Sequence, residues 1–154
     1  MAAFARACEL ATGVEDAAEK LSSYYGMWVA SLMRGELALM REVAEAFLKD
    51  GQRWSGLPEG VMARHVLGMT FWFQGDYVRA QPYLEQAIAA YDRDTHHHLT
   101  SRFGYDPGVQ AMFALAMVLW PLGGTDRSAH LVEEGLNLAL QSGPILGFAH
   151  TYTC

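Results

Sequence analysis

Apolar residues recur at steps of three and four along most of this chain, which is the spacing of one face of an α-helix. In residues 36–49 this face contains Val43, Ala44, Phe47 and Leu48. The same pattern predicts six long helices, which cover residues 24–33, 36–49, 61–73, 77–91, 109–122 and 126–141. We therefore expect an all-α fold.

A glycine separates the two helices of each successive pair, and these glycines are Gly35, Gly75 and Gly123. Glycine reaches the positive φ that ends a helix and reverses the chain. The helices should thus form three antiparallel hairpins, at about residues 15–50, 58–91 and 107–142. The intervals between the glycines are unequal, so the connections at 50–60 and 92–108 are enlarged.

Both ends of the chain have the pattern of an interrupted hairpin. Residues 2–12 are typical of a second helix, and residues 144–154 are typical of a first helix. A stack of hairpins exposes its last apolar face unless a polar cap covers that face. Neither end supplies such a cap. We therefore expect flanking domains in a longer chain, or a homo-oligomer that forms through the uncapped terminal repeats.

Residues 64–87 resemble one tetratricopeptide unit. The matching positions are Leu67, Gly68, Phe71, Gly75, Tyr77, Ala80, Leu84 and Ala87, whereas Arg64 stands where a large aromatic residue is usual. Gly68 and Ala80 would let the two helices approach closely. The resemblance implies one domain over residues 1–154, built as a right-handed superhelical stack (a TPR-like α-solenoid) of about seven or eight helices. Such units form interaction scaffolds and seldom carry out chemistry.

The chain also resembles the C-terminal helical-repeat region of bacterial signalling ATPases, in which an AAA-like ATPase is linked to an adenylate or guanylate cyclase or to a kinase. The most specific phrase is 102–109, and the others are 25–28, 33–37, 67–72, 83–87, 91–92 and 119–123. The chain has no GxxxxGK[ST] phosphate loop. The resemblance therefore implies a sensing or partner-binding module of a bacterial signalling protein, and not an enzyme.

First helices line the concave face of a tetratricopeptide stack, so the resemblance allows groove positions to be projected from the three glycines. The principal positions are Tyr25, Met33, His65, Met69, Trp72, Phe73, Phe113, Met117 and Trp120. The projection also includes Ser22, Val29, Leu32, Met62, Gln110 and Pro121.

This set contains aromatic and Met side chains and no Lys or Arg. An apolar protein or peptide partner therefore fits it better than an acidic peptide, since acidic groups need basic partners. The alternative function is a small-molecule receptor that uses the same groove. A third interpretation remains open, because an aromatic stripe at helical spacing is often simply core.

The connection at 92–108 contains the remaining candidates. His96 and His98 are weak candidates for metal binding, since adjacent histidines seldom face one ion. We expect a solvated loop there and no cofactor. Asp106 should cap the helix that follows, with Pro107 in its first turn, and Phe103 and Tyr105 should anchor the connection back onto the helices.

Two further histidines and the composition complete the sequence evidence. His65 and His130 fall in predicted helices, where a hydrogen-bonded structural histidine is the simplest interpretation. The net charge is −6 and the 11 basic residues are scattered, which argues against a nucleic-acid partner. No apolar run is long enough for a membrane span. With two distant cysteines, the chain is expected to be cytoplasmic.

Overall fold

The computed structural model describes residues 17–51, 58–96 and 105–142, and every regular element in these ranges is an α-helix. The helices are α2 (Ala17–Met33), α3 (Leu37–Gly51), α4 (Pro58–Phe73), α5 (Tyr77–Ala90), α6 (Arg93–His96), α8 (Pro107–Leu119) and α9 (Thr125–Ser142). The predicted all-α fold is therefore confirmed for this part of the chain. The predicted partial repeats at 2–12 and 144–154, and both cysteines, lie outside the described residues.

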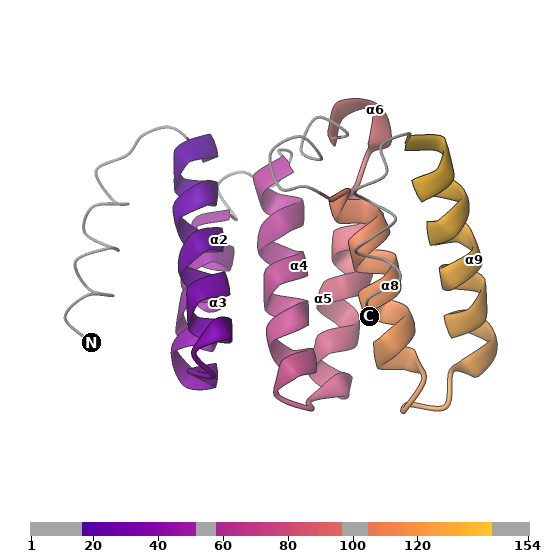
Figure 1. Cartoon of the computed structure of the whole chain (residues 1–154), viewed down its shortest axis with the longest axis horizontal. Coiled ribbons are helices and arrows are strands. Elements are labelled where there is room, and N and C mark those ends of the chain that lie inside the picture. Colours follow the sequence, from indigo (N-terminus) through magenta and orange to yellow (C-terminus); the bar gives the residue numbers. More distant parts are fainter. Residues whose placement is uncertain (1–16, 52–57, 97–104, 143–154) are drawn as a thin grey trace.

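The six long helices form three antiparallel pairs, α2–α3, α4–α5 and α8–α9, each joined by a short turn (Figure 1). The turn glycines have the expected positive φ, at Gly35 (70°), Gly75 (75°) and Gly123 (83°). At the second turn, Gly75 N–H donates to the Trp72 carbonyl at 2.9 Å and Asp76 N–H donates to the Phe71 carbonyl at 2.9 Å. The other two turns contain the same two bonds. These bonds satisfy carbonyls that a helix end leaves unpaired.

The pairs follow one another along the long axis of the molecule (Figure 1). The first helix of each later pair contacts both helices of the preceding pair: α4 packs on α2 and α3, and α8 packs on α4 and α5. A face formed by the two helices of one pair is therefore the surface that receives the next helix. No helix within the described ranges packs on α8–α9 from the far side.

The centre of the core is α4, which is buried along most of its length. Gly68 lies directly against Leu84 of α5, and a Cβ atom at Gly68 would stand 2.6 Å from the Leu84 Cγ. Leu84 itself is fully buried. One polar bridge crosses this core, because Trp28 Nε1 donates to the Thr70 hydroxyl at 2.8 Å and that hydroxyl donates to the Val66 carbonyl at 2.8 Å. The core is thus close-packed around a helix with no room for an added methyl group.

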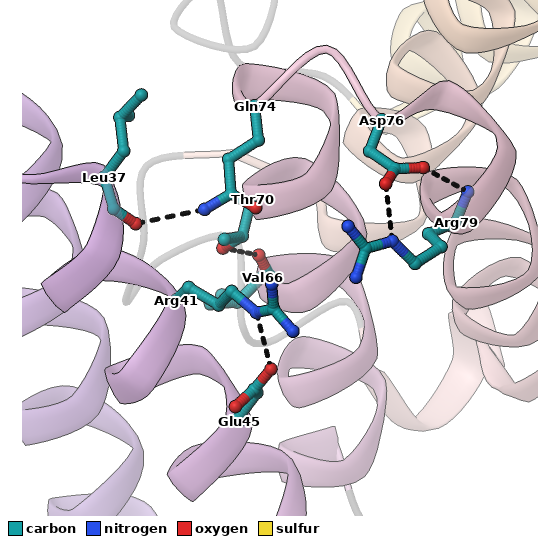
Figure 2. Close-up of polar contacts among 8 residues, drawn as sticks. All are labelled: Leu37, Arg41, Glu45, Val66, Thr70, Gln74, Asp76 and Arg79. Atoms are coloured by element: carbon teal, nitrogen blue, oxygen red, sulfur yellow. Dashed lines mark hydrogen bonds and ion pairs between the residues drawn. The ribbon is translucent and has the colours of Figure 1, made fainter.

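Polar contacts fasten α3 to the second pair near its turn. Gln74 Nε2 donates to the Leu37 carbonyl at 3.1 Å (Figure 2). The guanidinium carbons of Arg41 and Arg79 lie 5.5 and 4.7 Å from the centre of the Phe71 ring. Cation–π contacts of this length are attractive, so they stabilise the seam between α3 and α4–α5.

The long connection before α8 is more regular than its sequence indicates. It contains the four-residue helix α6, whereas we expected an irregular segment. Asp92 explains the difference, since its carboxylate accepts from Asp94 N–H at 3.1 Å and its own N–H donates to His96 Nδ1 at 3.0 Å. Local side-chain bonds of this kind leave no periodic trace in a sequence.

The start of α8 is as predicted. Asp106 caps the helix by accepting from Gly108 N–H at 2.8 Å and from Val109 N–H at 3.1 Å. Tyr91 donates its hydroxyl to the other Asp106 oxygen at 2.6 Å. Burial, together with this carboxylate, raises the pKa of Tyr91. A side chain at Gly108 would collide with the Tyr91 ring, so the end of α5 and the start of α8 fix each other.

No helix in the described ranges combines the length and apolar character needed to cross a membrane.

Two glycines on first helices provide a matched test of the α4–α5 contact. The Gly68→Ala substitution should lower the free energy of unfolding by about 1–2 kcal/mol, since the overpacking cost exceeds the gain in helix propensity. At Gly26 an added Cβ meets nothing within 4 Å, so Gly26→Ala should raise stability by about 0.5–1 kcal/mol. Urea unfolding of both variants checks this. Equal effects at the two sites would contradict the proposed role of Gly68.

Candidate functional site

The nine principal groove residues predicted from sequence do not share one surface. His65 and Met69 are buried, and Tyr25 is half-buried beside them. The others face solvent to different degrees, in a hollow between α8 and α9 or at the turns, and these are Met33, Trp72, Phe73, Phe113, Met117 and Trp120. The candidate site therefore separates into an interior part, a hollow and an exposed edge.

The interior part is filled by the chain itself. Tyr105 lies just before α8 and is buried, with its ring centre 6.2 Å from that of Tyr25 and 6.4 Å from that of His65. A hydrogen bond joins the hydroxyls of Tyr105 and Tyr25, and burial raises the pKa of both. The prediction that Tyr105 anchors the connection onto the helices is confirmed, while Phe103 lies outside the described residues. Tyr25, His65 and Met69 therefore belong to the core, which was the third interpretation of the apolar stripe in the sequence.

His65 is an isolated histidine inside this core. It is 3% exposed, and its Nδ1 has no hydrogen-bond partner among the described residues. The expectation of a satisfied histidine was therefore wrong, although the expectation of a structural one fits its burial. Desolvation lowers the pKa of His65 to about 4, because burial disfavours the charged imidazolium. The ring is thus neutral at physiological pH.

The exposed part follows the three turns, which lie along the same edge of the molecule (Figure 1). Each turn contributes two large exposed apolar side chains: Met33 and Leu37, Phe73 and Val78, and Trp120 and Leu122. We call these six residues the turn edge. Met33, Val78 and Trp120 are the most exposed, at 75%, 72% and 71%. Single exposed apolar residues are ordinary, and here a pair of them occurs at each of the three turns.

The charges beside the turn edge are balanced by local pairs. Arg34 bonds Glu36 at 2.8 Å, and Arg79 pairs with Asp76 (Figure 2). The backbone N–H and the guanidinium of Arg79 hold the pKa of Asp76 below its ordinary value. At the first two turns, the edge therefore offers apolar contact beside paired charges.

The α8–α9 hollow has a volume of about 880 Å³ and is mostly apolar. Its walls include Phe113 and Met117 from α8, Trp120 at the turn, and Val132 and Leu136 from α9. Trp72 and Tyr77 of the second pair close one end, and Gln110, Ser128 and Glu133 are among its polar members. The sequence projection missed the α9 residues because it considered first helices only. The amphipathic period of residues 126–141 was the available signal for them.

The hollow is lined by residues whose equivalents in the preceding helix pair are buried. Counted from the turn glycines, Phe113 is equivalent to His65, and Met117 is equivalent to Met69. His65 and Met69 are 3% and 7% exposed, whereas Phe113 and Met117 are half-buried. The second pair is followed by α8, and in the described part of the chain no helix follows α9. The hollow is therefore a helix-receiving face without a described occupant.

The metal candidates do not assemble. His96 is 5% exposed, not solvated as expected, and its Nδ1 already accepts the Asp92 N–H. His98 lies outside the described residues, and His130 is exposed on α9. Within the described ranges, no group of three or more His, Cys, Asp or Glu side chains could hold a metal ion.

Comparisons of the chain with protein-family models, with curated proteins and with solved structures found no match.

The buried imidazole of His65 predicts a specific loss of stability in acid. Its pKa is 6.5 in an unfolded chain and about 4 in the folded chain, so the unfolded state binds a proton first as the pH falls. Stability is fully present above pH 6.5 and falls by up to about 1.4 kcal/mol per pH unit between pH 6.5 and pH 4.

Urea unfolding at several pH values measures this loss. The His65→Phe variant should remove this component, and its larger ring has a precedent at the equivalent Phe113. The control is His130→Gln, which changes an exposed histidine and should keep the wild-type pH dependence. An unchanged pH dependence in His65→Phe would show that other groups cause the acid sensitivity.

Proposed function

We propose that this chain is a non-catalytic protein–protein interaction module that contacts its partner through the turn edge. The observation that carries the proposal is the repetition of two exposed apolar side chains at each of the three turns. The flanking charges pair locally, so a partner would be recognised by apolar contact and shape. Nucleic acid is a poor fit to such a surface, because its phosphates require clustered basic groups.

The proposal includes a finer description of the fold, as a right-handed tetratricopeptide-like α-solenoid. Three features support it: the identical turn bonds, the close approach of Gly68 to Leu84, and the position of α4 and α8 on the pair before each of them. Repeat arrays of this kind usually serve as binding scaffolds. By resemblance, we place the module in the cytoplasm, as part of a bacterial signalling protein.

The chemistry of the described residues supports a binding role over a catalytic one. The hollow contains a single carboxylate, Glu133. Of the hydroxyls that line it, that of Ser128 donates to the Ala116 carbonyl at 2.8 Å. The histidine with the perturbed pKa, His65, is enclosed in the core, where a substrate could not reach it. General acid–base chemistry needs an accessible titratable pair, and these groups do not provide one.

A small-molecule receptor is the second candidate function, and the α8–α9 hollow is the observation that favours it. Its volume of about 880 Å³ falls within the range of ligand pockets. Met117, Phe113 and Trp120 form an apolar and adaptable wall. Native mass spectrometry tests this function: a bound molecule that is lost from a Met117→Arg variant would support it.

The partner-binding function is tested with a variant of the turn edge. Met33→Ser combined with Val78→Ser removes two highly exposed apolar side chains that do not line the hollow. Affinity capture from cells that make the protein, followed by quantitative mass spectrometry, should show a partner retained by the wild type and lost from the double variant. Measured with that purified partner, the dissociation constant should rise at least about tenfold, since each buried side chain contributes about 1.5 kcal/mol or more.

The matched control is Leu140→Ser, which changes another exposed apolar residue, 61% exposed, near the end of α9 farther from the turns. It should retain the partner with unchanged affinity. All three sites are exposed, so the variants should unfold at the wild-type temperature. If the double variant and the control bind the partner equally, the turn edge is not the contact surface.

A further inference from the structure

The α8–α9 hollow matches the surface that α8 covers on the preceding pair. On α5, Ile88 packs against the cluster that contains Ala111 of α8. Its equivalent on α9, counted from the turn glycine, is Leu136, which lines the hollow. Because a helix, α8, covers the equivalent surface of α4–α5, we expect a helix to occupy the hollow as well.

An ion pair between successive helix pairs allows a second comparison of equivalent positions. Glu85 of α5 accepts from Arg127 of α9 at 2.7 Å, across the seam between successive pairs. The equivalent of Glu85 on α9 is Glu133, which also lines the hollow. Among the described residues, Glu133 has no such partner in a following pair. The apolar wall thus corresponds to a contact that α8 makes one pair earlier. The position of Glu133 corresponds instead to a contact with the second helix of a following pair, because Arg127 belongs to α9.

The sequence after α9 has the features of a first helix. Pro58 and Pro107 are the first residues of α4 and α8, and Pro144 comes two residues after α9 ends at Ser142. Proline is favoured at the first position of a helix. The intervening Gly143 can adopt the positive φ that ends α9 sharply.

The segment 144–152 also matches the hollow in chemistry and length. Its apolar residues at helical spacing are Ile145, Leu146, Phe148, Ala149 and Tyr152, and it contains no Lys, Arg, Asp or Glu. At a rise of 1.5 Å per residue, a helix over this segment is about 13 Å long. The wall that α8 gives to the hollow extends from Gln110 to Met117, or about 12 Å by the same rise.

We propose that the segment 144–152 docks as a helix in the α8–α9 hollow of its own chain, as α8 docks on α4–α5. Its apolar stripe then covers Leu136 and Phe113, in the part of the hollow farther from the turn. The short connection to α9 gives it a high effective concentration, so a free ligand or partner must displace it. The small-molecule candidate function loses this part of its pocket while the segment is docked. The proposal is independent of partner binding at the turn edge, because Met33 and Val78 lie outside the hollow.

A double-mutant cycle in the full chain tests this contact. The variants are Leu136→Ala in the hollow, Phe148→Ala in the segment, and both together, each unfolded in urea. Each substitution raises the equilibrium constant for unfolding by some factor. If the two side chains touch, the factor for the double variant should be about tenfold smaller than the product of the two single factors. Independent sites give that product within about twofold, and this result would overturn the proposal.

Two controls separate the remaining explanations. His150→Ala lies on the other side of the predicted helix from Phe148, since residues i and i+2 face away from each other, and its cycle with Leu136→Ala should give the simple product. The measurements are repeated over a hundredfold range of protein concentration. A coupling that disappears on dilution would mean that a second copy supplies the segment, and this would overturn docking within one chain. If either alanine variant fails to fold, Leu136→Val and Phe148→Leu give the same cycle with a smaller expected coupling.

Discussion

The packing of α4 against four other helices, α2, α3, α5 and α8, is the interaction on which the rest of the structure depends. The absence of a side chain at Gly68 lets α5 approach, and the bond from Trp28 to Thr70 fixes α2 against the same helix. A single helix pair cannot bury both of its apolar faces, so each pair requires a neighbour. The central pair has a neighbour on each side, and that is why its stripe is buried where the equivalent stripe of α8 is open.

The turn edge follows from how the pairs reverse direction. A positive-φ glycine turns the chain within a few residues, so side chains at the adjoining helix ends or within the turn itself project beyond the core. Apolar side chains at these positions add little to core burial. Their presence at all three turns is therefore not required by the packing of the core, and it is the basis of the proposed contact with a partner.

Helices and turns could be predicted from sequence because both depend on local features, namely apolar spacing and glycine. The Asp106 cap was predictable for the same reason. The division of the groove was not, because it depends on where the long connection returns, and Tyr105 occupies the space between Tyr25 and His65. The burial of His96 was missed as well, since it depends on the bond from Asp92 N–H and on the Tyr91 ring, whose centre lies 5.7 Å from that of His96. The spacing of residues does not reveal where a connecting segment packs back onto the helices.

Trp120 connects the two surfaces, since it belongs both to the turn edge and to the α8–α9 hollow. A small molecule bound at the turn end of the hollow would cover part of Trp120 and leave Met33 and Val78 exposed. A partner that needs the whole edge would then compete with that ligand for one side chain, whereas a partner that uses only the first two turns would not. Mutual exclusion of this kind requires a shared residue and no change of fold, because each ligand shifts the equilibrium only by its differential affinity. The position of Trp120 therefore determines whether occupancy of the hollow can regulate binding at the edge.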